Sequence, residues 1–88
     1  MKKVKIEITE RDIELGRGLV GDGTRCPVAR ALRRKLRDKF FACGCTYFVY
    51  GDSYVDLPKK VSQFMYDLFD GAQAKAKPFS FTINLPAS

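Results

Sequence analysis

Residues 26–58 read CPVARALRRKLRDKFFACGCTYFVYGDSYVDLP, and their pattern predicts a helix followed by two strands. Cys-Pro at 26–27 marks the start of the helix, because proline is favoured in a first helical turn. Apolar residues spaced by three or four then form one buried helical face: Val28, Ala29, Leu32, Leu36 and Phe40. Residues 42–50, rich in aromatic and β-branched side chains, predict a strand. Gly51-Asp52 predicts a tight turn into a returning strand over residues 53–57.

Two further strands and a second helix flank this central part. Residues 2–8 alternate between apolar and charged side chains, and residues 79–85 alternate in a similar way, so both predict half-buried strands. Leu57-Pro58 opens a second helix, and Asp70-Gly71 ends it. Its buried face consists of residues at i, i+3, i+4 and i+7: Val61, Phe64, Met65 and Leu68.

The predicted elements follow the order β-α-β-β-α-β. A short extra helical turn follows the first strand, capped by Thr9 with Asp12 as its capping-box partner. This order is typical of a ferredoxin-like α+β fold, a two-layer sandwich in which two helices cover one face of a four-stranded antiparallel sheet. Strand pairing is not fixed by element order alone, so other α+β arrangements stay compatible. The length of 88 residues predicts a single domain over residues 1–88.

The composition bounds the class of protein. An apolar fraction of 45% and a charged fraction of 30% are typical of a globular protein. No apolar run reaches the roughly 20 residues that span a bilayer, and charged residues interrupt the N-terminal segment where a signal sequence would lie. Three cysteines, an odd number, agree with reduced thiols. We therefore expect a cytoplasmic protein without a membrane partner.

The residues for catalysis or metal binding are scarce. The chain contains no histidine, the commonest general base and the commonest metal ligand. A structural zinc site takes four ligands, whereas Cys43 and Cys45 have only Cys26 as a third thiol. Two cysteines at i, i+2 on a strand point to the same face, which suits burial. We therefore expect no metal, no cofactor and no enzymatic activity.

The net charge of +6 comes from one segment. Residues 25–39 carry seven basic side chains and one acidic side chain, whereas residues 1–24 and 40–88 are each neutral overall. Arginines at i, i+3, i+4 and i+7 share one face of the predicted helix, opposite its apolar stripe: Arg30, Arg33, Arg34 and Arg37. Guanidinium groups bind phosphate oxygens bidentately, so this face predicts an anionic ligand. An acidic protein surface and a plain solvated face are the alternatives.

The glycine-rich loop before this helix is a second candidate anion site. It leads directly into the helix N-terminus, where exposed N–H groups and the helix dipole favour an anion. The residues assigned to this site are Arg17, Gly21, Gly23, Thr24 and Arg25. The loop matches neither a P-loop nor a dinucleotide-binding pattern. Glycines that serve only the turns of the loop explain it as well.

Tyrosines cluster in the predicted hairpin. Tyr47, Tyr50 and Tyr54 stand on strands, where outward-facing rings can stack on unpaired bases. Aromatic residues of strands also pack in cores and in dimer interfaces. An exposed sheet face on a small domain is compatible with homo-oligomerisation.

Four segments resemble short proteins of unknown role from tailed bacteriophages and prophages: ITERDIELG (8–16), CPVARALRR (26–34), LPKKVSQFMYDLFDG (57–71) and KPFSFTINLP (77–86). The resemblance covers most of the chain, and its most specific parts are Cys-Pro-Val-Ala-Arg-Ala-Leu and Lys-Pro-Phe-Ser-Phe. It implies a small phage protein made in the cytoplasm of a bacterial host. Accessory phage proteins of this kind often counter host defences, and the resemblance assigns no activity to particular residues.

Together, these features predict a non-catalytic protein that holds a phosphate-bearing ligand, either a nucleotide signal or a nucleic acid. Its role would be sequestration, without bonds made or broken. The alternative is an inhibitor whose basic helix docks onto an acidic surface of a host protein, with charge setting the association rate and the register.

Overall fold

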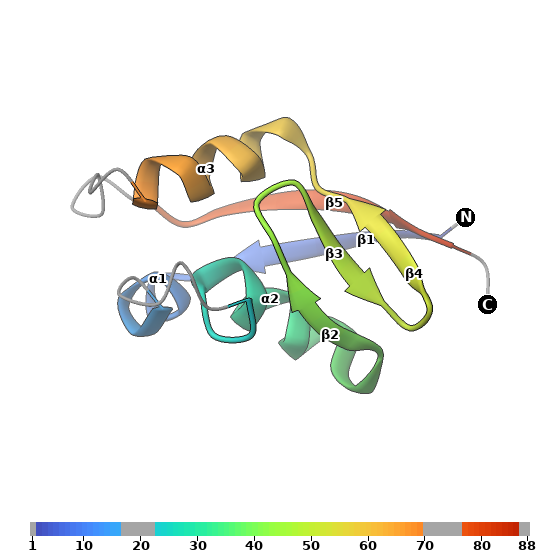
Figure 1. Ribbon diagram of the computed structural model, residues 1–88. Coiled ribbons are helices and arrows are strands. Elements are labelled where there is room, and N and C mark those ends of the chain that lie inside the picture. Colours follow the sequence, from blue (N-terminus) through green and yellow to red (C-terminus); the bar gives the residue numbers. More distant parts are fainter. Residues whose placement is uncertain (1, 17–22, 70–76, 87–88) are drawn as a thin grey trace.

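The computed structural model describes residues 2–16, 23–69 and 77–86 and is an α+β structure, as expected (Figure 1). Its elements follow one another in this order: β1 (Lys2–Ile8), α1 (Glu10–Gly16), α2 (Pro27–Leu36), the 3-10 helix η2 (Arg37–Lys39), β2 (Phe40–Cys43), β3 (Tyr47–Tyr50), β4 (Ser53–Asp56), α3 (Lys59–Phe69) and β5 (Phe79–Leu85). Within the described ranges, no helix combines the length and the apolar character needed to cross a bilayer.

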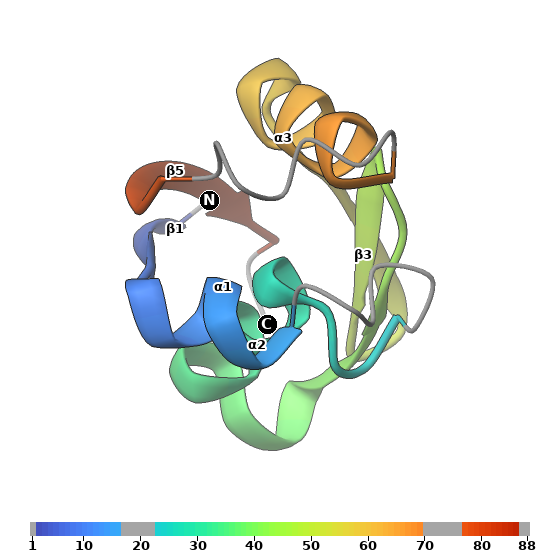
Figure 2. The same cartoon turned by 90° about the vertical axis from the view of Figure 1, so that its left-hand side faces the viewer.

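The strands form two antiparallel sheets, so the prediction of one four-stranded sheet is wrong. β1 pairs with β5 along the whole of both strands, from Lys2 opposite Leu85 to Ile8 opposite Phe79. β2, β3 and β4 form the second sheet in that order. In Figure 2 the two sheets lie on opposite sides of the molecule, with α3 above and α1 and α2 below the space between them. The helices therefore lie on two sides of the core and do not share one sheet face.

The extra strand arises at residues 44–46, which we predicted to lie within a continuous strand over residues 42–50. Gly44 donates its N–H to the carbonyl of Tyr47 at 2.7 Å, and the chain reverses there. β2 and β3 consequently pair as a hairpin, with Cys43 opposite Phe48. The aromatic pattern around this turn resembles one long strand, and only the glycine marks the reversal.

Two local predictions are confirmed. Tyr50 pairs with Ser53 across the turn between β3 and β4, and Gly51 has a φ of 59°, which glycine adopts without a Cβ clash. At the start of α1, the Thr9 N–H donates to Asp12 Oδ2 at 3.0 Å, and the Asp12 N–H donates to Thr9 Oγ1 at 3.1 Å. This is the expected capping box.

One apolar cluster fills the space between the sheets. β1 and β5 contribute alternate residues: Val4, Ile6, Ile8, Phe81, Ile83 and Leu85. The second sheet and the helices complete the cluster with Phe40, Cys43, Phe48, Val55, Val28, Ala29, Leu32, Val61, Met65 and Leu68, among others. Phe40 packs here from β2 and not from the helix, because α2 ends at Leu36 and Arg37 then takes a positive φ of 56°. The predicted helical stripe is otherwise confirmed.

Candidate anion-binding site

Two of the four arginines expected on a free helical face, Arg30 and Arg34, form internal ion pairs with Asp12. The Asp12 side chain is only 1% exposed. Arg34 donates Nη1 to Oδ1 at 2.9 Å and Nη2 to Oδ2 at 2.8 Å, a bidentate pair that joins α1 to α2. Arg30 Nε lies 3.5 Å from Oδ1. The expectation of four free guanidinium groups is therefore wrong for Arg30 and Arg34.

Asp12 is held in its charged form. Burial opposes ionisation, but the hydrogen bonds from the Arg34 side chain and the Thr9 amide outweigh it and hold the pKa of Asp12 below its usual value. The same contact raises the pKa of Arg34. Arg34 Nη2 also donates to the carbonyl oxygen of Glu7 at 2.8 Å, so this side chain connects β1, α1 and α2.

The other two arginines lie apart from this pair. Arg33 donates from Nη2 to the carbonyl oxygen of Thr24, and its guanidinium carbon lies 5.9 Å from the centroid of the Phe40 ring. Arg37 is exposed at the C-terminal end of α2. The four guanidinium groups therefore do not converge on one ligand.

The N-terminus of α2, the second candidate site, is enclosed by protein. Cys26 is the N-cap residue, and its Sγ accepts a hydrogen bond from the N–H of Ala29 at 3.4 Å. Cys26, Val28 and Ala29 are fully buried. Gly16 of α1 packs so closely that a Cβ on it would lie 2.6 Å from the nitrogen of Pro27. The prediction of an anion site at this helix end is therefore wrong, since such a site needs accessible N–H groups.

The loop residues assigned to that site have other contacts. The Gly23 carbonyl accepts a hydrogen bond from Cys43 N at 2.8 Å, and a Cβ on Gly23 would lie 2.8 Å from the Cys43 oxygen, so glycine here permits close packing on β2. Thr24 is half-buried, and Arg25 is exposed. Arg17 and Gly21 lie outside the described residues.

The three tyrosines lie on two different surfaces. Tyr47 and Tyr54 occupy the outward face of the β2-β3-β4 sheet, 43% and 75% exposed, with ring centroids 5.4 Å apart in an edge-to-face contact. Tyr50 is half-buried against the core on the other face of the sheet, and Lys39 Nζ lies 5.7 Å from its ring centroid. The prediction that all three rings form one stacking surface is therefore wrong.

Positive charge gathers instead between α2 and the edge of β1 that faces away from β5. Two hollows of about 330 and 350 Å³ follow each other there. The first is lined by Lys5, Glu7, Thr9, Ala31, Arg34 and Lys35. The second is lined by Lys2, Lys3, Val4, Lys5, Lys35, Leu36, Tyr50 and Leu85. Because Lys5 and Lys35 line both hollows, we treat them as one basic groove.

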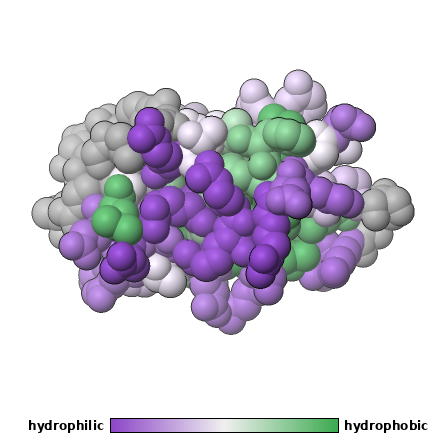
Figure 3. Space-filling view, turned by 90° about the horizontal axis from the view of Figure 1, so that it is seen from below, coloured by the Kyte–Doolittle hydropathy of each residue, from purple (hydrophilic) through white to green (hydrophobic). Residues whose placement is uncertain are grey.

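The two halves of the basic groove differ in charge. Four lysines and, among the residues that the structure describes, no carboxylate line the second hollow. The first hollow contains Glu7, whose Oε1 lies 3.8 Å from Lys5 Nζ in an exposed pair that contributes little to stability. Figure 3 views the molecule from the side of α1 and α2, where hydrophilic residues dominate the surface. The second hollow is therefore the more positively charged of the two by its lining residues.

The backbone of β1 adds hydrogen-bond donors to the groove. Arg34 reaches the Glu7 carbonyl from α2, so this carbonyl points away from β5. In an antiparallel pair, alternate residues turn both their N–H and their C=O away from the partner strand. Lys5 and Lys3, two and four residues before Glu7, therefore direct their N–H groups to the groove. Backbone N–H groups of this kind bind phosphate oxygens.

The lysines of β1 were not among the predicted site residues, because residues 1–24 are neutral overall. The carboxylates of α1, Glu10, Asp12 and Glu14, balance their charge. The available signal was the spacing in KKVKIEI, which concentrates three lysines at one end of a strand.

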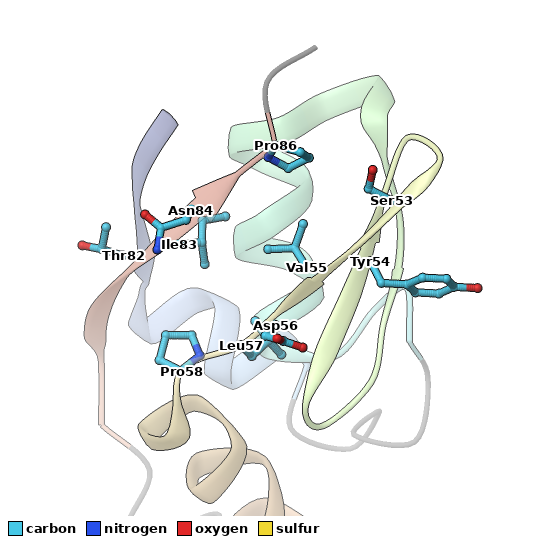
Figure 4. Close-up of a pocket in the computed structure, with 10 residues that line it drawn as sticks. All are labelled: Ser53, Tyr54, Val55, Asp56, Leu57, Pro58, Thr82, Ile83, Asn84 and Pro86. Atoms are coloured by element: carbon cyan, nitrogen blue, oxygen red, sulfur yellow. The ribbon is translucent and has the colours of Figure 1, made fainter. Parts of the chain in front are cut away.

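A further hollow of about 540 Å³ lies between β4 and β5 (Figure 4). Val55 and Ile83 lie on facing strands there, and Tyr54 projects outward. Asp56 is the only charged residue among the described residues that line it. This hollow would repel an anion and is a poor candidate for the same ligand.

The cysteines form a buried thiol pair. Cys26 and Cys43 place their Sγ atoms 3.7 Å apart, and neither residue forms a disulfide. Over the described part of the chain, no group of three or more histidine, cysteine, aspartate or glutamate side chains could hold a metal ion.

Comparisons with protein-family models, with curated proteins and with solved structures gave no match to this chain. Any function must therefore be proposed from the geometry of the basic groove.

Proposed function

We propose that the protein binds a phosphate-bearing anion in the basic groove and holds it without chemical change. The observation that carries this proposal is the second hollow, where four lysines surround about 350 Å³ and the described lining residues include no carboxylate. Ammonium groups gathered in this way repel one another, and a bound anion relieves that repulsion.

Phosphate suits the donors of the groove. Lysine is a common phosphate ligand, acting as a mobile point charge, and the N–H groups of Lys3 and Lys5 add directional hydrogen bonds. The remaining lining residues are apolar or aromatic, with Val4, Leu36, Leu85 and the ring of Tyr50. Such a surface accepts a sugar or a base beside the phosphate, and small-molecule sites of about 300–1,000 Å³ usually combine apolar walls with a few polar groups.

Sequestration is the role we propose for this binding. The lysines of the second hollow offer charge, but its described lining residues include no histidine or carboxylate to act as a general base. The resemblance to short phage proteins would place this activity in an infected bacterial cell. The alternative partner, an acidic protein surface, fits less well because the lysines line a hollow and not a protruding face.

Fluorescence anisotropy with labelled octathymidylate and calorimetry with thymidine triphosphate test this proposal at low salt. We expect Lys3→Gln/Lys35→Gln to weaken binding by about tenfold or more, since two charges leave the hollow. Lys59→Gln/Lys77→Gln is the matched control, because it removes the same charge from exposed positions at α3 and before β5. Equal losses in both variants, or no binding of either probe to the wild type, would overturn the proposal.

A further inference from the structure

The basic groove is elongated. It follows β1 from Thr9 and Glu7 at one end to Lys2 and Leu85 at the other. At about 3.3 Å per strand residue, this path is roughly 20 Å long. A mononucleotide would occupy one of the two hollows and leave the other empty.

Cations line the groove on both sides. Lys3 and Lys5 lie on β1, and Arg34 and Lys35 lie on α2. A nucleic acid strand carries one phosphate per about 3.4 Å of stacked length, so the groove spans roughly four to six phosphates. A polymer therefore meets cations from both walls, and the first hollow is the less positive half because Glu7 lines it and Asp12 pairs with Arg34.

An aromatic ring stands at one end of this path. Tyr50 lines the second hollow beside Lys2, Lys3 and Lys35. Lys39, the residue directly before β2, places its Nζ 5.7 Å from the centroid of the Tyr50 ring. A positively charged groove with an aromatic ring is the usual arrangement in proteins that bind single strands with little sequence preference.

A double helix fits this surface poorly. A helix that reads the major groove of DNA must present an exposed face. On α2, Arg30 and Arg34 turn to Asp12 of α1, and the donors of Lys3 and Lys5 lie within a groove beside a strand edge. We infer that the ligand of the basic groove is a single strand of nucleic acid, threaded between β1 and α2 with one base against Tyr50; this inference rests on the proposed function.

The length of the probe tests this inference. We expect affinity to rise by about tenfold or more from thymidine monophosphate to tetrathymidylate, and then to level off near octathymidylate, as the groove fills. The logarithm of the association constant should fall with the logarithm of salt at a slope of about −3, since roughly four phosphates each contribute about −0.7. If thymidine monophosphate binds as tightly as octathymidylate, the inference of a single-stranded ligand is overturned, and the proposed function still holds. A hairpin duplex that binds as tightly as the single strand also overturns that inference, and failure of every probe defeats both proposals.

Tyr50 is tested separately with the same octathymidylate. We expect Tyr50→Phe to bind like the wild type and Tyr50→Leu to lose about tenfold. Tyr54→Leu, on the outward face of the sheet, is the matched control and should bind normally. Crosslinking of the wild-type protein to iododeoxyuridine-containing octanucleotide, read by mass spectrometry, covers the case in which Tyr50→Leu does not fold. A crosslink at Tyr54 and none at Tyr50, or a loss of affinity only in Tyr54→Leu, overturns the placement of the base.

Discussion

Arg34 holds Asp12 by two hydrogen bonds of 2.8 and 2.9 Å, although the two residues lie 22 positions apart in the chain. The carboxylate is buried and the guanidinium is about half exposed, with side-chain exposures of 1% and 51%. Asp12 also completes the capping box of α1, and Arg34 also reaches the backbone of β1. This contact therefore fixes the relative positions of three elements at one end of the basic groove.

Replacement of Asp12 should destabilise the fold strongly. Asp12→Asn keeps a side-chain oxygen for the Thr9 amide but removes the charge, which leaves Arg34 and Arg30 without their counter-ion. We expect a loss of about 1–3 kcal/mol in the free energy of unfolding, because charged hydrogen bonds are lost while the guanidinium of Arg34 that is left behind is half exposed. Urea denaturation measures it. Asp38→Asn, at an exposed carboxylate of η2, is the control and should change stability by no more than about 0.5 kcal/mol. Equal effects in the two variants would contradict the role of the pair.

The stabilisation of the fold by Asp12 should decrease at acidic pH. Because the folded state holds the pKa of Asp12 below its value in the unfolded chain, the stabilisation is complete above the unfolded pKa of about 4. It is lost as the pH falls through the lower, folded pKa. The difference in unfolding free energy between the wild type and Asp12→Asn should therefore be constant above about pH 5 and shrink below about pH 4. Chemical denaturation in a series of buffers measures this difference, and a gap that widens in acid would contradict it.

Gly16 should tolerate no side chain. A Cβ at this position would lie 2.6 Å from Pro27 N and 2.9 Å from the carbonyl carbon of Cys26, both backbone atoms that cannot turn aside. We expect Gly16→Ala to cost about 1–3 kcal/mol, because α1 must move away from α2. Thermal unfolding followed by circular dichroism measures the cost. At Gly44 a Cβ would meet atoms no nearer than 3.7 Å, so Gly44→Ala is the control and should unfold close to the wild-type temperature.

The three thiols should differ in reactivity. The Cys26 thiol beside it and burial both raise the pKa of Cys43, so little thiolate forms there. Burial also raises the pKa of Cys45, but this residue is only half-buried. We expect iodoacetamide to modify Cys45 first in the native protein, and all three residues at similar rates in urea. Peptide mass spectrometry gives the order, and faster labelling of Cys43 than of Cys45 would contradict it.

Local features of this fold were predictable, whereas long-range ones were not. The Thr9–Asp12 capping box and the Gly51 turn depend on neighbouring residues, so their patterns were sufficient. The reversal at Gly44 lies inside an aromatic-rich run, where a single glycine is a weak signal. The pairing of β1 with β5 joins the two ends of the chain, which no local pattern specifies.

The candidate site shows the same division. The basic face of α2 was visible in the spacing of its arginines, but the partner of Arg34 and Arg30 lies on a different helix. A charge count by segments could not reveal this neutralisation, because it depends on how α1 packs against α2. For the same reason it concealed Lys3 and Lys5, which face the groove only because β1 lies beside α2.

The edge of β1 beside α2 has a second consequence for the molecule. An open strand edge can pair with another chain and seed aggregation, and natural proteins often protect such edges with lysines. Here Lys3 and Lys5 stand at that edge, and Arg34 donates a hydrogen bond to the carbonyl oxygen of Glu7. The side chains that would hold a ligand therefore stand where edge lysines discourage pairing between copies, and we expect their replacement by neutral residues to favour self-association.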